Sequence, residues 1–203
     1  MKSLVLMLSL LCSAAFAEQA CEVVAVSGEA QRADGKALAV GDKLDVGTTL
    51  RTGPAGRVRL KFGDGSVLVL ADKSQLRIDA YSAGTAKPRE AEFMLELGLV
   101  GQKVSPVAGG AWKVRTPTAV TAVRGTEFIV EVGDDRATAV HVKTGEVDVE
   151  PIGAQTRGIK PRYPVRLAKT LNGTQCDAKE CTAPIAWAAE KVQRIEQRLG
   201  SLD

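Results

Sequence analysis

The segment between Cys21 and Glu150 shows the two-residue hydrophobic period of β-strands and never the 3.6-residue period of a helix. Arg57–Phe62 reads R-V-R-L-K-F, a strict alternation that predicts a strand with one buried face. Glycine-containing turns such as Gly53–Gly56 and Gly63–Ser66 separate the short strands. The pattern therefore predicts an all-β domain over residues 18–150, and it leaves barrel, sandwich and short solenoid open.

The most unusual stretch is Thr116–Phe128, which reads T-P-T-A-V-T-A-V-R-G-T-E-F. Valine and threonine favour extended backbone, and Pro117 excludes a helix where the stretch begins. A charged turn then interrupts the apolar pattern at Arg124, Gly125, Thr126 and Glu127. We predict a structural turn in which the guanidinium of Arg124 binds Glu127 or backbone carbonyls. The alternative is that these four residues contact a partner.

Composition and charge argue against several classes of function. The 203 residues include 27 basic and 24 acidic side chains without a basic run of five, so no nucleic-acid surface is predicted. The single histidine, His141, alternates with Val140 and Val142, and we expect it to be neutral or solvent-facing. Asp64 and Ser66 fit hairpin-turn chemistry. Without a metal-ligand set or a nucleophile–base constellation, we predict no cofactor, no metal site and no enzymatic activity.

Residues 1–17 carry the features of a cleavable signal peptide. Lys2 supplies the positive start, Leu4–Leu11 is almost continuously apolar, and Ala15-Phe16-Ala17 gives the small-x-small cleavage pattern. The apolar run is too short for a membrane span, and no later stretch qualifies. We therefore expect cleavage near Ala17, a periplasmic or secreted mature chain, and no transmembrane segment.

Three cysteines would remain after cleavage, in an oxidising compartment. We predict a disulfide between Cys176 and Cys181, because loop closure favours near neighbours. Cys21 would then be a free thiol or pair with another molecule. The alternative pairs Cys21 with one of the two tail cysteines.

Residues 151–203 differ from the preceding strands and form a predicted tail. Pro184 after Thr182 is typical of a helix start, and Gly200 of a helix end. Apolar residues recur at spacings of three and four, which predicts an amphipathic helix over residues 184–200. These residues are Ile185, Ala188, Val192, Ile195, Leu199 and Leu202. We expect the apolar stripe to pack on the β domain; the alternative is a short coiled-coil contact that makes a homo-oligomer.

Several motifs occur in the order found in one known family. They are Val40-Gly41-Asp42 with Leu44, Gly47–Gly53, Val58–Ser66, Leu95–Gly98, Val114–Ala119, Val123–Phe128 and Lys143–Val147. On these motifs the sequence resembles the FecR domain family, the extracytoplasmic β domain of iron-siderophore signal regulators. The resemblance covers roughly Val23 to Val149.

The resemblance implies an all-β, solenoid-like or sandwich fold that binds or transmits rather than catalyses. Regulators of this family combine a cytoplasmic anti-sigma segment, one membrane helix and this domain, whereas here a predicted signal peptide stands in front. We therefore predict an exported, non-catalytic interaction or signalling module of the bacterial cell envelope, binding a protein partner through the β domain. The alternative is a structural envelope protein associated with peptidoglycan or polysaccharide, with Trp112 and Phe128 stacking on sugars.

Overall fold

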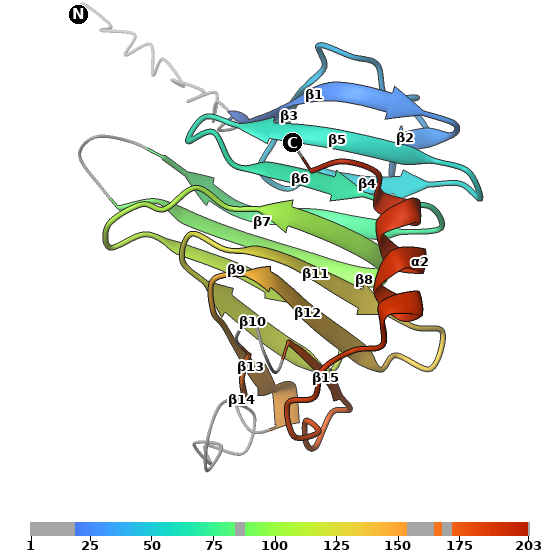
Figure 1. The fold of residues 1–203 in the computed structure, drawn as a ribbon. Helices are drawn as coiled ribbons and strands as arrows, with labels where there is room; N and C mark the ends of the chain where they lie inside the picture. The colour runs from blue at the N-terminus through green and yellow to red at the C-terminus, as the bar shows by residue number, and fades with distance from the viewer. Residues whose placement is uncertain (1–18, 84–87, 154–164, 168–171, 203) are drawn as a thin grey trace, which may run out of the picture.

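The computed structural model describes residues 19–83, 88–153, 165–167 and 172–202, so the predicted signal peptide lies outside the described residues. Two β-sheets pack against each other, and one helix lies on the outside of the first (Figure 1). Sheet A contains β3 (Lys43–Asp45), β1 (Gln19–Ser27), β5 (Arg57–Phe62), β6 (Val67–Leu70), part of β8 (Glu90–Lys103), β11 (Glu127–Val132), β12 (Thr138–Thr144) and β15 (Gly173–Cys176). Sheet B contains β2 (Ala30–Arg32), β4 (Thr49–Thr52), β7 (Gln75–Ser82), the rest of β8, β9 (Ala111–Arg115), β10 (Ala119–Val123), β13 (Val147–Pro151) and β14 (Val165–Leu167).

In both sheets the strands follow one another almost in chain order. Sheet A runs β3-β1-β5-β6-β8-β11-β12-β15, and sheet B runs β2-β4-β7-β8-β9-β10-β13-β14. The described neighbours are antiparallel, apart from the parallel pair β8 and β9. The chain thus advances like a solenoid while its strands form the two layers of a sandwich, which confirms the prediction of an all-β fold with a C-terminal helix.

Strand β8 belongs to both sheets. Its first part, up to Leu97, pairs with β7, and its second part, from Gly98, pairs with β6 and β11. Gly98 has a φ of 95° at this change of sheet, and a Cβ there would collide with Ser74. Only glycine adopts this backbone conformation without strain. One continuous strand therefore ties the two layers together.

The core between the sheets is built mostly from valine and leucine, with the aromatic rings gathered at one end. Phe62 of sheet A contacts Phe93 and Trp112 of sheet B, with ring centroids 5.5 Å and 5.1 Å apart. Trp112 and Phe128 are both fully buried. Neither ring can therefore offer a face to a sugar.

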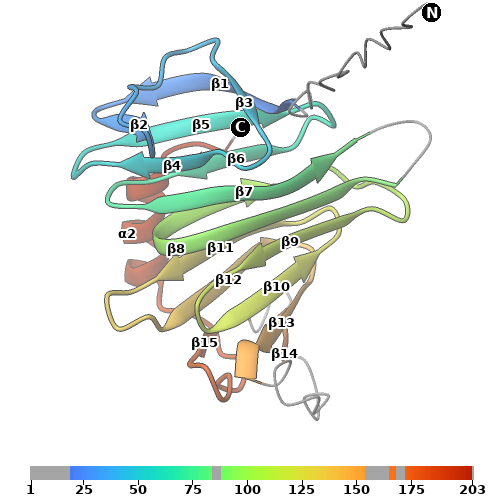
Figure 2. The same ribbon diagram turned by 180° about the vertical axis from the view of Figure 1, so that it is seen from behind.

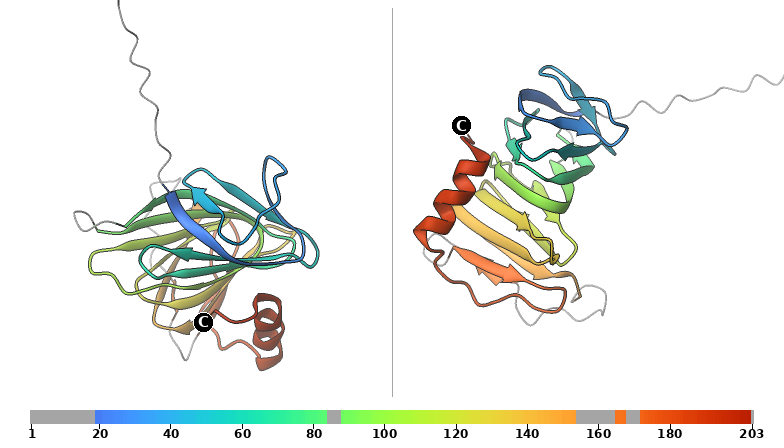
Figure 3. Two further views of the ribbon diagram at one scale, coloured as in Figure 1. Left: turned by 90° about the horizontal axis from the view of Figure 1, so that it is seen from above. Right: turned by 90° about the vertical axis from the view of Figure 1, so that its right-hand side faces the viewer.

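Helix α2 (Ala189–Leu199) covers the outer face of sheet A, as Figure 3 shows from the side; in Figure 2 it lies behind sheet B. It is shorter than the predicted span of 184–200. The hydroxyl of Thr182 accepts the backbone N–H of Gln175, and Ile185 exchanges backbone hydrogen bonds with Gly173. These contacts with β15 keep the chain extended, so the helix begins only at Ala189. Gly200 does end it, with its N–H bound to the carbonyl of Glu196.

The last part of the predicted apolar stripe packs on the β domain, whereas Ile185, at 56% exposure, and Ala188 are exposed. Ile195, Leu199 and Leu202 form a cluster with residues of the outer face of sheet A, namely Val69, Ala71, Leu99 and Ile129. The disulfide between Cys176 and Cys181 is confirmed, and Cys21 is a free, buried thiol. Within the described ranges, no helix is long and apolar enough to cross a membrane.

Candidate functional site

The Thr116–Phe128 stretch makes a corner between the two sheets. Strand β10 pairs with β9 and β13 in sheet B, whereas β11 pairs with β8 and β12 in sheet A. Gly125 has a φ of 60°, and a Cβ there would lie 2.8 Å from the Cβ of Pro106. The buried Thr126 hydroxyl donates to the carbonyl of Arg124 at 3.2 Å or of Glu146 at 3.1 Å. Gly125 and Thr126 therefore build this corner.

The predicted pair between Arg124 and Glu127 does not form. Glu127 binds the ammonium of Lys143 at 2.7 Å, on the outer face of sheet A beside α2. Arg124 is exposed at the outer face of sheet B, and in the described part of the chain its side chain has no hydrogen bond or ion pair. The corner separates the two charges, because each belongs to a different sheet. The prediction that Arg124 locks the turn was wrong.

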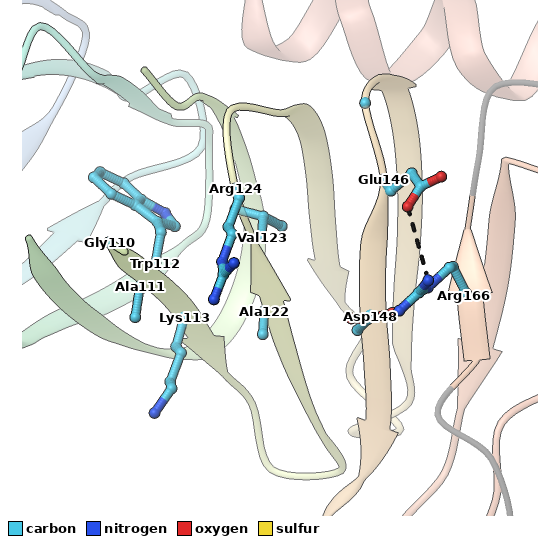
Figure 4. A pocket seen from close by; sticks show the side chains of 11 residues that line it. Gly110, Ala111, Trp112, Lys113, Ala122, Val123, Arg124, Glu146, Asp148 and Arg166 are labelled. Atoms are coloured by element: carbon cyan, nitrogen blue, oxygen red, sulfur yellow. Dashed lines mark hydrogen bonds and ion pairs between the residues drawn. The ribbon is translucent and has the colours of Figure 1, made fainter. Parts of the chain in front are cut away.

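Arg124 instead lines a groove of about 690 Å³ on the outer face of sheet B (Figure 4). Strand register places four groove residues in one row across β9, β10, β13 and β14: Lys113, Ala122, Asp148 and Arg166. Because the side chain of Ala122 is small, the groove is deeper between Lys113 and Asp148. Gly110, Ala111, Trp112, Val123, Gly145 and Glu146 complete the lining.

The charges of the groove divide into a paired side and an unpaired side. Arg166 donates to Asp148 at 2.8 Å and lies 4.0 Å from Glu146; its hydrogen bond to Asp148 raises the pKa of this exposed guanidinium. Lys113, like Arg124, has no ion-pair partner among the residues with described positions. Lys113 lies opposite Ala122, and Arg124 follows two residues later, just past the end of β10.

Elsewhere on this face, arginines have acceptors. Arg115 lies 3.3 Å from Glu92, and Arg136, from the loop between β11 and β12, lies 3.7 Å from Glu96 of β8. Arg77 is paired with Asp79. Lys113 and Arg124 therefore differ from these arginines, because neither has an ion-pair partner among the described residues.

A buried ion pair between Arg89 and Asp64 lies near the aromatic end of the core. The two side chains are 1% and 6% exposed, and Nη1 of Arg89 is 2.5 Å from Asp64 and 2.8 Å from the carbonyl of Ser105. The guanidinium also stands 5.4 Å from the ring of Trp112. Sequence reasoning missed this pair, because no local pattern links residues 25 positions apart. The predicted turn itself forms, with Ser66 donating to Asp64.

His141 lies beneath the C-terminal tail, opposite in direction to Val140 and Val142, which enter the core. It is 3% exposed, so the solvent-facing alternative was wrong. Burial lowers its pKa and favours the neutral form. Its ring stacks on Trp187, with centroids 5.0 Å apart. Within the described residues, no group of three or more His, Cys, Asp or Glu side chains could hold a metal ion.

Comparisons with known proteins agree with the motif-based resemblance. The family model described as FecR protein matches residues 48–148, which include the Arg124 corner and most of the groove. Two crystal structures of a proposed anti-sigma factor from Parabacteroides distasonis ATCC 8503 share the fold, with TM-scores of 0.52 and 0.53 at 22% and 21% identity. Each alignment covers 71% of this chain and 62% of the solved one. No curated protein matched the chain.

Proposed function

Because residues 48–148 belong to the FecR family, we propose that this protein is a non-catalytic interaction and signalling module of the bacterial cell envelope. Residues 1–17 would direct its export, and the periplasm or the exterior would be its site of action. The disulfide between Cys176 and Cys181 supports an oxidising compartment. The description of the solved neighbours as proposed anti-sigma factors supports a regulatory role.

The groove on sheet B is the proposed partner-binding site. The observation that carries this proposal is that Lys113 and Arg124 line one groove and, among the residues that the structure describes, have no ion-pair partner, whereas Arg77 and Arg115 do. A carboxylate between them would form charge-assisted hydrogen bonds with both, and the planar guanidinium can bind it with two donors. We infer that the partner is a protein segment rich in aspartate or glutamate.

The burial of the aromatic rings favours a protein partner over a polysaccharide. Trp112 and Phe128, the rings considered for sugar stacking, are fully buried. Tyr81 is only 6% exposed and contacts Asp64. The groove therefore offers charge and hydrogen bonding rather than a ring platform.

Cross-linking mass spectrometry in intact cells tests the proposal. Wild-type protein should capture a specific partner, and the double variant Lys113→Glu/Arg124→Glu should lose it. Arg51→Glu is a matched control, because Arg51 is exposed on the same face and binds Gln75. Capture that survives in a folded double variant would rule out the groove. Groove-dependent sedimentation with purified peptidoglycan would favour the structural alternative.

A further inference from the structure

The C-terminal tail forms a hydrophobic cluster separate from the main core. Ile195, Leu199 and Leu202 pack on the outer face of sheet A, whereas the main core fills the space between the two sheets. Sheet A thus stands between the two clusters. Loss of the tail contacts would uncover an apolar stripe without opening the core.

Polar contacts that hold the tail lie at the protein surface. Arg198 binds Asp72 at 2.9 Å and Glu131 at 2.7 Å, and Lys143 lies 3.1 Å from Glu196. These side chains are about a quarter to a half exposed, so water and salt screen them. Arg57 also donates to the last carbonyls of the helix. Docking of the tail on sheet A therefore depends strongly on its apolar contacts and on the residues of sheet A that the tail covers.

His141 lies beneath the start of this segment. Its ring is nearly parallel to that of Trp187, at 17°, and the ammonium of Lys191 stands 3.5 Å from the Trp187 centroid. Nδ1 of His141 is buried without a hydrogen-bond partner within the described part of the chain. A neutral imidazole can leave one nitrogen as an unprotonated acceptor, but an imidazolium has two N–H donors. Protonation would bury a donor that has no acceptor, which is unfavourable.

We propose that residues 187–202 form a pH-sensitive latch, which protonation of His141 releases from the outer face of sheet A. The released segment keeps its anchor in β15, where the disulfide joins Cys176 to Cys181. Release exposes the apolar stripe formed by Val69, Ala71, Leu99 and Ile129. This inference is independent of the groove on sheet B.

The charged groups around His141 act on its protonation in both directions, so burial is the main cause of its lowered pKa. Lys143 of β12 and Lys191 of α2 repel a positive ring, and Glu196 of α2 attracts it. The residues directly opposite on β11 and β15 are Ile129 and Gly173, which carry no charge, and a hydrogen bond with the backbone of Asn172 favours the protonated ring. Glu127 and Glu131, on either side of Ile129, are bound to Lys143 and Arg198.

The direction of the pH effect follows from the lowered pKa of His141, whose main cause is burial. The docked state holds fewer protons than the released state in the pH range between its own lowered pKa and the ordinary histidine pKa of about 6.5. Docking therefore weakens as the pH falls below that value and is strongest above it. A single proton can change the docking equilibrium by at most about tenfold per pH unit.

Hydrogen exchange of the full chain tests the latch. After correction for the intrinsic pH dependence of exchange, α2 amides should exchange up to about fivefold faster at pH 5.5 than at pH 6.5, whereas β8 amides stay protected. His141→Phe keeps a ring beneath Trp187 but cannot titrate, so its corrected α2 exchange should not change with pH. Leu199→Asp is the positive control, because a buried carboxylate should release the tail at every pH.

Two results would overturn the proposal. One is wild-type α2 protection that is equal at both pH values. The other is an equal pH-dependent loss in wild type and in His141→Phe, which would assign the release to carboxylates. Protection of β8 verifies that each variant is folded, and His141→Gln provides a second untitratable side chain if His141→Phe fails to fold.

Discussion

Gly101 lies directly beneath Leu199, and a Cβ atom on Gly101 would stand 2.8 Å from Cδ1 of that leucine and 3.1 Å from Cδ2 of Leu202. Glycine in the interior of a strand normally weakens it. Here the missing side chain in β8 creates the space into which the last turn of α2 packs. The two residues are nearly a hundred positions apart in the sequence, yet the size of one sets the position of the other.

Gly101→Val should loosen the tail. The added side chain would push Leu199 and Leu202 away from sheet A, and we expect the free energy of unfolding to fall by about 1–3 kcal/mol. Urea denaturation measures the loss, and hydrogen exchange should locate it in α2. Gly63→Ala is the control, because a Cβ there meets only the Tyr81 hydroxyl at 3.7 Å. Unchanged α2 protection in Gly101→Val would contradict the packing role of this glycine.

Arg124→Ala should leave stability within about 0.5 kcal/mol of wild type, because the side chain is exposed and has no ion-pair partner in the described ranges. Gly125→Ala, one position later, should cost about 1–3 kcal/mol, since it combines a positive φ with a close approach to Pro106. Thermal and urea denaturation of both variants check this contrast. A large loss in Arg124→Ala would restore the guanidinium as a structural element of the corner.

Arg89→Met should be among the most destabilising single changes. It leaves the buried carboxylate of Asp64 without its cation, a change that costs about 3–5 kcal/mol. The double variant Arg89→Met/Asp64→Asn should recover part of that loss, because it removes the unpaired charge. Denaturation of the two variants in urea gives both values. A single-variant loss below about 1 kcal/mol would show that the pair is dispensable.

Cys21 should make stability fall at high pH. Burial, and secondarily the charge of Asp45, raise the pKa of its thiol to about 12. The folded state keeps the proton, whereas the unfolded chain loses it above about pH 8.5. Stability should therefore fall as the pH rises above that value, by up to about 1.4 kcal/mol per unit. Unfolding free energies between pH 8 and 10 should show this additional slope in wild type and not in Cys21→Ala; equal slopes would disprove it.

Alternation and turn residues were sufficient to predict the all-β class, because the apolar residues within a strand show which of its faces is buried. They could not assign strands to sheets. Strands β10 and β11 follow each other within one motif, but they belong to different sheets: β10 pairs with β9 and β13, and β11 pairs with β8 and β12. The helix start at Pro184 failed for a related reason. Thr182 has the chemistry of a helix cap, yet it binds β15 instead.

The candidate site was predictable only in part. Arg124 was singled out because it interrupts an apolar pattern, and it does line the groove. Lys113 and Arg166 were not, because each becomes its neighbour only through strand register. The buried Nδ1 of His141 likewise depends on a tail that returns from the end of the chain. Residue type is local information, whereas a site depends on which distant strands meet.

The near-sequential order of strands in both sheets has a consequence for how the molecule is made. A polypeptide emerges from its ribosome or translocon N-terminus first. For most strands, the neighbouring strand with which they pair has therefore already emerged. Assembly can then proceed by addition to a growing end, and few segments must wait for a distant partner. The tail is the exception, because Arg198 reaches back to Asp72 across 126 positions. Docking of the tail on sheet A would therefore be the last step of folding.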